Sequence, residues 1–248
     1  MDPAALVGAR IEVRGDRAHH LRRVARVRDG ERVVAFDGTG REREATVASA
    51  RDDRVELIPA GDVRGGVVAD RARVTWIQGV PKGDKLETIA RQATELGVAR
   101  IIPAFTERSV PVERPDRVEA QHARLLRIVE EAARQCGRAD LPEVLRPCAL
   151  DAALDRAMDL ALRLVAWESA ARPLRTLDDP GDGGIAVLAG PEGGISEAEV
   201  ARARARGFVA VSLGPRILRA ETVAPALLGA LSSRWGDIAI GATSHDAR

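Results

Sequence analysis

The sequence predicts an α/β protein of two domains, a small β-rich domain over residues 1–68 and an α/β domain with a mostly parallel sheet over residues 71–248. Up to about residue 60, apolar and polar residues alternate in short runs separated by turns, which is typical of antiparallel strands. From about residue 73, apolar runs alternate with amphipathic helical stretches, which indicates repeated βα units. A chain of 248 residues, 45% of them hydrophobic, is long enough to bury two modest cores.

The first domain is predicted to contain four strands, in residues 10–13, 32–36, 45–47 and 54–58. Asp29-Gly30 and the Asp-Gly-Thr-Gly run at 37–40 are turn signals between them. Residues 19–27 are the one helical candidate, with Leu21 and Val24 on a shared face. Short strands at regular spacing predict a small barrel, and residues 61–66 have the glycine content of a linker.

The second domain is predicted to alternate strands and helices. Strands are expected over residues 73–79, 98–105, 162–167, 185–189 and 208–213, and helices over 84–97, 115–136, 196–207 and 222–235. Two helix starts resemble capping boxes, Asp84 with Glu87 and Ser196 with Glu199. These repeats predict a mostly parallel sheet with helices on both faces.

The composition restricts the class of protein. No stretch approaches the roughly 20 apolar residues of a membrane-spanning helix, and the start of the chain lacks the pattern of a signal peptide. The two cysteines, Cys136 and Cys148, are too few for a disulfide framework, and no group of residues has metal-ligand spacing. We therefore expect a soluble cytoplasmic protein without a metal.

Arginine is clustered at two places in a chain whose net charge is only +1. Six arginines lie between Arg14 and Arg28, and five between Arg202 and Arg219. Clustered basic groups are typical of a surface that follows a phosphate backbone, but a solvated helix face balanced by acids elsewhere explains them equally well. The only lysines are Lys82 and Lys85, a skew that the codons of a GC-rich genome would produce.

Two loops stand out because each follows the carboxyl end of an apolar strand. They are Gly190-Pro191-Glu192-Gly193-Gly194 and the Gly-Pro-Arg-Ile-Leu-Arg-Ala-Glu-Thr run at 214–222. Ligands of open α/β sheets bind at this edge, and glycine lets the backbone approach them closely. Neither loop has the GxGxxG or GxxxxGK[ST] pattern, which disfavours binding of a nucleotide phosphate. Ordinary βα turns are the alternative explanation for either loop alone.

Taken together, the two loops resemble the cofactor-binding motifs of SPOUT methyltransferases, the trefoil-knot class. Further blocks resemble the RsmE family within that class: Pro81–Lys85, Thr94–Val98, Glu107–Val110, Glu131–Arg138 and Pro142–Val144, with His20-Leu21 and Asp37–Gly40 in the first domain. The resemblance covers residues 19–231. Arg91, Ala220 and Val223 depart from the usual pattern of the family.

The resemblance to the RsmE family implies an α/β fold with a deep trefoil knot in the C-terminal domain and a PUA-like, RNA-binding β-barrel at the N-terminus. It implies methylation of N3 of a uridine in 16S ribosomal RNA with S-adenosyl-L-methionine as cofactor, and hence the small ribosomal subunit as partner. It also implies a homodimer with the last helix in its interface. General rules of topology alone would predict an unknotted sheet.

The resemblance further implies roles for particular residues. The expected cofactor-binding residues are Gly190, Pro191, Glu192, Gly193, Gly194, Leu213, Gly214, Ile217 and Leu218. Arg219 is the expected donor to the charge that develops on the uracil ring, and Glu221 or Glu192 is expected either to accept the proton or to orient Arg219. Glu221 would alternatively serve only the dipole of the last helix. RNA contacts are expected from Arg22, Arg23, Arg26, Arg108 and Arg138, with a solvated face as the alternative for the first three.

Three other functions share part of this pattern. A SPOUT ribose 2′-O-methyltransferase would have the same cofactor loops, and the identity of the methylated atom would distinguish it. A non-catalytic RNA-binding or ribosome-assembly protein would keep the scaffold without binding the cofactor. A metabolic oxidoreductase is disfavoured because the dinucleotide fingerprint is missing.

Overall fold

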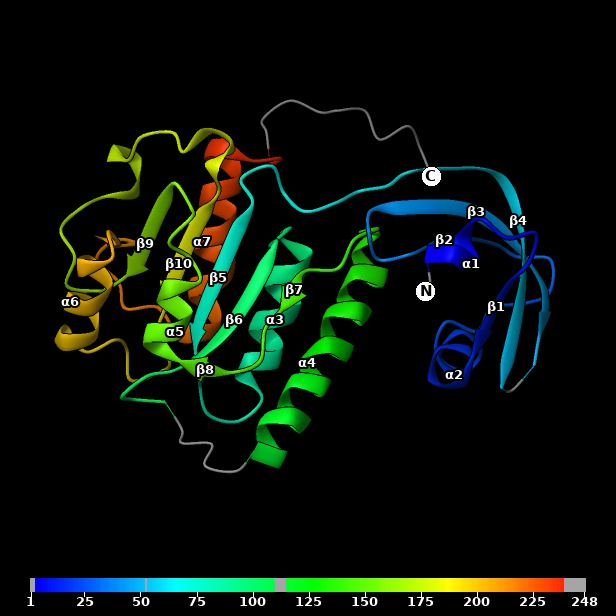
Figure 1. The fold of residues 1–248 in the computed structure, drawn as a ribbon, viewed down its shortest axis with the longest axis horizontal. Helices are drawn as coiled ribbons and strands as arrows, with labels where there is room; N and C mark the ends of the chain where they lie inside the picture. Colours follow the sequence, from blue (N-terminus) through cyan, green and yellow to red (C-terminus); the bar gives the residue numbers. More distant parts are fainter. Residues whose placement is uncertain (1–2, 52, 110–114, 239–248) are drawn as a thin grey trace. The chain divides into compact units, whose positions relative to one another are not determined.

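The structure, a computed structural model, describes residues 3–51, 53–109 and 115–238. They form two compact units (Figure 1). The first unit comprises Met1–Val68 together with Ala133–Leu141, and the second comprises Ala69–Ala132 together with Pro142–Arg248. The sequence pattern indicates the change of architecture near residue 70, but it does not indicate that residues 133–141 pack with the first unit. Val110, the last residue of one motif block, lies outside the described residues.

The first unit is built on an antiparallel sheet. Its elements are α1 (Pro3–Leu6), β1 (Ile11–Arg14), α2 (Gly15–Arg23), β2 (Arg32–Phe36), β3 (Arg41–Ala50) and β4 (Arg54–Gly65). The strands pair in the order β1-β4-β3-β2. The four predicted strands are confirmed, and β3 and β4 are longer than predicted. Alternate residues such as Val55 and Leu57 are buried, together with Leu6 and Ile11, in the core of this unit.

Two predicted element boundaries in the first unit are wrong. The helix begins at Gly15, directly after β1, and ends at Arg23, so that Val24 is 65% exposed and does not share a buried face with Leu21. Most of the predicted linker belongs to β4, where Arg64 lies opposite Glu42 of β3 and donates to its carboxylate (Nε–Oε1, 3.0 Å). Pairing with β3, rather than burial of an apolar face, holds this part of the strand in place. Its side chains are therefore mostly polar, and the sequence shows no strand pattern there.

The described sheet of the first unit is open. β1 and β2 are its edge strands, and no described pair joins them, so these four strands do not form the closed barrel that their spacing predicts. Residues 133–141 instead lie against the turn between β2 and β3. The amide of Gly40 donates to the carbonyl oxygen of Ala139 (3.2 Å), and the amide of Leu141 donates to that of Gly38 (3.1 Å). The Asp-Gly-Thr-Gly turn thus binds a segment distant in sequence.

The second unit confirms the predicted α/β class. Its elements are β5 (Val74–Gly79), α3 (Lys85–Glu95), β6 (Arg100–Phe105), α4 (Pro115–Cys136, whose last turn belongs to the first unit), β7 (Glu143–Val144), β8 (Cys148–Ala149), α5 (Leu150–Asp155), β9 (Leu162–Ala166), two 3₁₀ turns (Leu174–Thr176 and Gly181–Gly183), β10 (Ile185–Ala189), α6 (Glu197–Ala205), β11 (Val209–Val211) and α7 (Ala220–Trp235). The strand order is β11-β9-β10-β5-β6-β7, with β8 also beside β6, and all described pairs are parallel. Helix α5 and strands β7 and β8 were not predicted.

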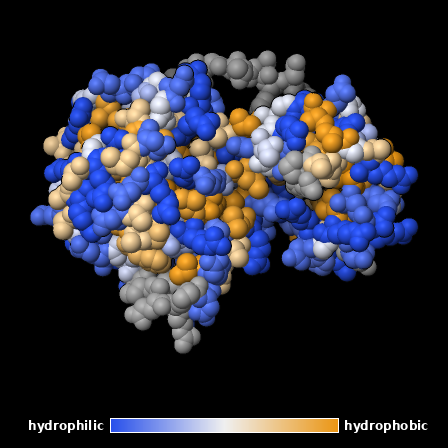
Figure 2. Space-filling model, in the orientation of Figure 1, coloured by the Kyte–Doolittle hydropathy of each residue, from blue (hydrophilic) through white to orange (hydrophobic). Residues whose placement is uncertain are grey.

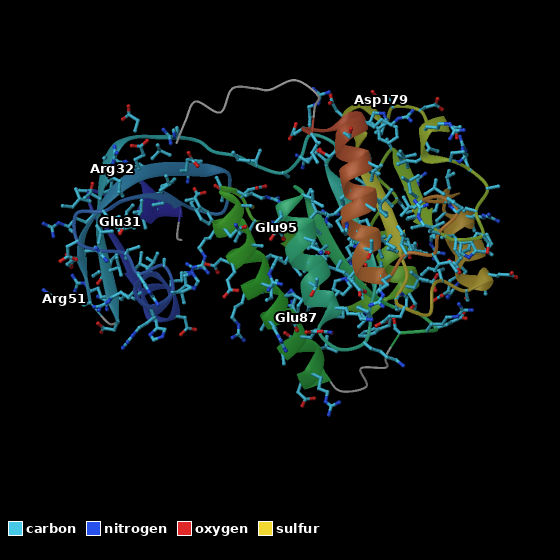
Figure 3. All side chains as sticks on the ribbon, turned by 180° about the vertical axis from the view of Figure 1, so that it is seen from behind. Glu31, Arg32, Arg51, Glu87, Glu95 and Asp179 are labelled. Carbon is cyan, nitrogen blue, oxygen red and sulfur yellow. The ribbon has the colours of Figure 1, made fainter. Side chains whose placement is uncertain are left out.

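Helices cover both faces of this sheet, as predicted. Trp76 of β5 and Val187 of β10 point into one core with α3, α4 and α7, which lie side by side in Figure 3. Ile77 and Leu188, the next residue along each strand, point into a second core with α5 and α6, on the opposite face (Figure 1). Alternating burial on two apolar faces explains why these strands are continuous apolar runs in the sequence.

One of the two predicted capping boxes is present. The hydroxyl of Ser196 accepts from the amide of Glu199 (3.2 Å), and the Glu199 carboxylate accepts from the amide of Ser196 (3.0 Å). The box at Asp84 is absent, since Asp84 is not extended (φ −94°, ψ 7°) and its side chain makes no capping bond. Glu87 instead pairs with Arg124 of α4 (2.7 Å), and Figure 3 shows it beside the α4 ribbon.

Hydrophilic residues predominate on the visible surface of each unit, and hydrophobic ones appear in limited patches (Figure 2). The most exposed large apolar side chain among the described residues is Ile217, at 87%. Isolated apolar residues on a surface are ordinary, so Ile217 gains significance only from the loop that carries it.

Candidate functional site

The carboxyl ends of β9, β10 and β11 lie at one edge of the sheet of the second unit. Leu188 of β10 is opposite Val165 of β9, and Val211 of β11 is opposite Ala166. Because the strands are parallel and in register, the loops that follow them start at the same edge. The two glycine-containing loops singled out by the sequence are therefore brought together, and residues from both line a common pocket.

The pocket has a volume of about 550 Å³, with a smaller lobe of about 80 Å³ beside it. The larger lobe is lined by Lys85, Ala166, Glu168, residues 190–194, residues 217–220 and Val223. The smaller lobe is lined by residues 166–168, 211–214, 216–218 and Val223. Each of the nine residues expected to bind the cofactor lines at least one lobe, and Arg219 lines the larger one. Ligand sites of this size hold small organic molecules and cofactors.

A buried glutamine holds the 190–194 loop. Gln78, near the end of β5, is fully buried; its Nε2 donates to the carbonyl oxygen of Gly190 (3.0 Å), and its Oε1 accepts from Nε1 of Trp76 (2.9 Å). A Cβ on residue 190 would lie 2.8 Å from the carbonyl carbon of Gly194. Glycine is therefore required at 190, because the loop turns back on itself without space for a side chain.

Glu192 connects this loop to the turn before α3. Both of its carboxylate oxygens accept from the amide of Lys82 (3.2 Å each), and Oε1 lies 2.8 Å from Nζ of Lys85. Burial raises the pKa of the Glu192 carboxyl, but the hydrogen bonds from Lys85 and from the backbone outweigh burial and hold the pKa below its ordinary value. Glu192 is thus ionised, and its contacts hold the 190–194 loop against the turn before α3.

Arg219 and Glu221 lie where the second loop enters α7. Arg219 is the exposed N-cap residue of that helix, and its side chain makes no capping bond. Glu221 is in the first helical turn; its Oε2 is buried, has no hydrogen-bond partner among the described residues, and lies 4.0 Å from Nζ of Lys85. A buried carboxylate oxygen without a donor carries a desolvation cost that a ligand or substrate would relieve.

Comparisons with known proteins agree with this geometry. The family described as RNA methyltransferase domain matches residues 69–232, and the RNA methyltransferase PUA domain matches residues 13–60. The Bacillus subtilis (strain 168) ribosomal RNA small subunit methyltransferase E is 31% identical over 89% of this chain and 88% of that protein. The chain belongs to this RNA methyltransferase family.

Two solved structures of similar chains have the cofactor bound. One is the ribosomal RNA small subunit methyltransferase E of Neisseria gonorrhoeae bound to S-adenosyl methionine, 32% identical, with a TM-score of 0.82 over 94% of this chain and 95% of the other. The other is a Legionella pneumophila methyltransferase in complex with the bound cofactor SAM, 30% identical, with a TM-score of 0.86 over 93% and 94% of the two chains. The α/β fold and the PUA-type N-terminal domain are those that the resemblance implied.

The apolar part of the pocket comes from the second loop. Leu213 and Leu218 are half-buried, and Ile217 is 87% exposed although it lines both lobes. Gly214, at φ +109°, adopts a backbone conformation that L residues rarely adopt. A lining that combines apolar side chains from one loop with glycines from the other suits a flat heteroaromatic group with polar edges.

The arginines expected to contact RNA in the first unit have different surroundings. Arg22 is partly buried, and its guanidinium donates to the carbonyl oxygen of Ala50 (Nη1–O, 2.7 Å). Arg23 and Arg26 are exposed, and Arg26 has a positive φ of 55°. Arg23 and Arg26 thus present their charges to solvent, whereas Arg22 also supports its own domain.

Arg138 and Arg108 differ still more. Arg138 is 3% exposed and forms a two-bond ion pair with Asp140 (2.5 and 3.1 Å), so burial favours a structural role in docking residues 133–141. Arg108 is exposed in the second unit, and its guanidinium donates to the carbonyl oxygen of Gly193. Arg108 therefore supports the first loop, although it lines neither lobe of the pocket.

The sequence pattern missed Lys85, Ala166, Glu168 and Val223 as pocket residues. Glu168 follows β9 at the same sheet edge as the two loops, a position that could have signalled it. Its carboxylate makes no hydrogen bond or ion pair with the described residues, and Glu168 lines both lobes. Lys85 ends the motif block Pro81–Lys85 and is one of two lysines, but the block assigns it no role and codon usage explains the rarity of lysine.

Two kinds of site are absent from the described part of the chain. None of its groups of histidine, cysteine, aspartate and glutamate side chains is arranged to hold a metal ion. None of the helices in residues 3–51, 53–109 and 115–238 is long and apolar enough to cross a membrane.

Proposed function

We propose that this protein methylates N3 of a uridine in 16S ribosomal RNA of the small ribosomal subunit, with S-adenosyl-L-methionine as the methyl donor. The observation that carries the proposal is the single pocket that the two loops share at the carboxyl edge of the sheet. Family membership supports the reaction class, since related proteins are named ribosomal RNA small subunit methyltransferases and similar structures bind the cofactor. The choice of uridine N3 rests on the resemblance to the RsmE family.

The residues of the pocket fit the cofactor. Backbone groups of Gly190, Gly193 and Gly194 line the larger lobe without side chains that would fill it, and Leu213, Ile217 and Leu218 supply the apolar wall for an adenine ring. The Glu168 carboxylate adds negative charge, which suits a ligand with two cationic groups. When bound, S-adenosyl-L-methionine supplies an electrophilic methyl group on a sulfonium.

Arg219 and Glu221 carry the chemistry on the RNA side in this proposal. The uridine N3–H must lose its proton, and negative charge then spreads onto O2 and O4 of the ring. Arg219, exposed at the pocket, donates to that charge. Glu221 accepts the proton, because its Oε2 has no hydrogen-bond donor among the described residues, whereas Glu192 is committed to Lys82 and Lys85. Much of the remaining catalysis is positioning.

In this proposal the two domains have different functions. Residues 1–68 act as the PUA-like RNA-binding domain, with Arg22, Arg23 and Arg26 near the phosphates, and residues 71–248 act as the methyltransferase domain. A deep trefoil knot at the two loops is supported by their shared pocket and by the place of β10 between β9 and β5. A homodimer through α7 and a cytoplasmic location complete the proposal, the latter because ribosomal RNA is the substrate.

The test uses small subunits that lack the modification. They are incubated with the purified protein and cofactor carrying a labelled methyl group, and the RNA is digested to nucleosides for mass spectrometry. Label in N3-methyluridine is the expected result. Label in a 2′-O-methylated nucleoside would indicate a ribose methyltransferase, and label in another base would move the target. No cofactor binding by calorimetry at millimolar concentration would indicate a non-catalytic RNA-binding protein.

A further inference from the structure

Lys85 is a cationic side chain of the larger lobe to which the proposed mechanism gives no role on the RNA. It is the first residue of α3, is half-buried, and lines the larger lobe together with Arg219. Its Nζ lies 2.8 Å from Oε1 of Glu192 and 4.0 Å from Oε2 of Glu221. The ammonium is thus placed between a carboxylate that is fully engaged and one that is not.

The surroundings keep Lys85 charged. The hydrogen bond to Glu192 raises the pKa of the Lys85 ammonium above its ordinary value, while burial and the neighbouring Arg219 guanidinium oppose this rise. Lys85 and Arg219 line the same lobe of the pocket. Lys85 therefore remains a hydrogen-bond donor throughout the pH range in which a uridine N3–H is removed.

The charges around the pocket explain what a second cation would do. The larger lobe is lined by the cations Lys85 and Arg219 and by the carboxylates Glu168 and Glu192, and Nζ of Lys85 also lies 4.0 Å from Oε2 of Glu221. When a base proton moves to Glu221, that carboxylate loses its negative charge and the uracil ring gains one. Lys85, which lies beside Glu221, then faces a neutral acid and an anionic ring. The electrostatic attraction between the Lys85 ammonium and the ring therefore becomes strong only when the ring becomes charged.

We propose that the Lys85 ammonium donates a hydrogen bond to one of the two carbonyl oxygens of the uracil ring as N3 is deprotonated, while Arg219 donates to the other. O2 and O4 lie on opposite sides of N3, so a donor beside one does not serve both. The N3–H proton passes to Glu221, the N3 electron pair forms the new N–CH₃ bond, and the electrons of the broken C–S bond stay on sulfur. The inference rests on the proposed function.

The test combines Lys85→Met with a substrate whose N3–H is more acidic. Small subunits are assembled on RNA transcribed with uridine or with 5-fluorouridine, since fluorine withdraws electrons from the ring and stabilises its anion. Single-turnover methylation is followed at saturating cofactor. Lys85→Met is expected to slow the reaction about 100-fold on uridine and several-fold less on 5-fluorouridine. Lys85→Arg, which keeps the cation, should recover part of the rate on uridine.

Controls separate this role from others. Lys82→Met removes an exposed charge from the same turn but keeps the backbone amide that binds Glu192, so it should show the parent protein's ratio of rates on the two substrates. Circular dichroism checks folding, and calorimetry measures the affinity for the cofactor. An equal deficit of Lys85→Met on both substrates, or a deficit explained by weaker cofactor binding, would overturn the inference. A parent protein that forms no N3-methyluridine would instead overturn the proposed function.

Discussion

The strand-end pocket of the second unit and the basic helix α2 of the first unit both carry cationic side chains, but they hold them differently. In the pocket, Lys85 is held by Glu192, and beside the pocket Arg108 is held by the backbone of Gly193. On α2 and just after it, Arg23 and Arg26 are exposed to solvent. A cation in a fixed position stabilises charge at one atom of a substrate, whereas a solvated cation attracts any phosphate nearby.

This difference predicts different kinds of defect. Substitutions in the pocket should reduce the rate of methyl transfer or the affinity for the cofactor, and salt should change these effects little. Substitutions around α2 should weaken RNA binding, and the size of their effect should depend on salt. Four variants test the comparison, from the largest expected effect to the smallest.

Arg219→Ala should give the largest effect. Removal of one donor from the charge that develops in the transition state typically slows an enzyme about 10²- to 10³-fold, and Arg219, exposed at a helix N-cap, contributes little to folding. Single-turnover methylation of small subunits measures the rate, and thermal unfolding checks the fold. Arg175→Ala, on an exposed turn that lines neither lobe, is the control. A rate within threefold or so of the parent protein would remove Arg219 from the site.

Gly190→Ala should reduce affinity for the cofactor about 10- to 100-fold, because overpacking costs about 1–3 kcal/mol. The new Cβ would lie 2.8 Å from the carbonyl carbon of Gly194 and would displace one side of the pocket. Calorimetry with S-adenosyl-L-methionine provides the measurement. Gly229→Ala in α7, where a Cβ meets nothing within 4 Å, should keep the affinity and stabilise the helix by up to about 1 kcal/mol. Unchanged affinity in Gly190→Ala would show that this loop does not shape the site.

Asp37→Asn tests a fixed charge in the first unit. Burial raises the pKa of the Asp37 carboxyl, but hydrogen bonds from Thr39 and Arg41 outweigh burial and hold the pKa at about 2, against an ordinary 3.8. A depressed pKa stabilises the fold above the unfolded pKa, and this stabilisation is lost as the pH falls through 3.8 toward 2.

The free energy of unfolding of Asp37→Asn should therefore be about 2 kcal/mol lower than that of the parent protein at pH 7, and the deficit should shrink progressively below pH 4. Urea unfolding of the parent and variant proteins at pH 7 and below pH 4 measures this loss. Asp62→Asn, which removes an exposed carboxylate on β4, is the control. A deficit that is independent of pH would assign the effect to packing rather than to charge.

Arg23→Ala should give the smallest effect at low salt. Loss of one phosphate contact should reduce the slope of log affinity against log salt by about 1. Fluorescence anisotropy with a small-subunit RNA fragment across several salt concentrations measures the slope. Arg32→Ala, an exposed arginine on β2 that Figure 3 labels, removes the same charge elsewhere on this unit. Equal slopes for the two variants would mean that the charge of the unit as a whole, and not the α2 region, attracts RNA.

Some elements could be predicted to the residue, and the reasons are physical. The helix over residues 115–136 has a long apolar stripe at helical spacing, and the strand over residues 185–189 is an apolar run bounded by glycines. Both patterns arise because the buried positions of a helix or strand are occupied by apolar residues at a regular spacing, which is visible in the sequence. The second half of β4 shows no such apolar pattern, because Arg64 and its neighbours are held by pairing with β3.

The site shows the same division. The two glycine-containing loops were recognisable because close approach of backbone requires glycine at particular positions, such as Gly190. Lys85 and Glu168 were not predicted to line the pocket, since a charged residue beside a ligand and one on a solvated surface look alike in a sequence. Arg138 shows the converse: it ends a motif block expected to face RNA, yet it is buried against Asp140.

The sequence by itself determined the class of each unit, most of the strands and helices, and the pair of loops that meet at the pocket. These follow from local periodicity and from backbone constraints that particular residues impose within a few positions. Only the tertiary structure decided that residues 133–141 join the first unit, that Glu192 is committed to the turn before α3, and that Lys85 lies beside Glu221. Contacts between residues distant along the chain depend on how the elements pack, and no local pattern encodes that packing.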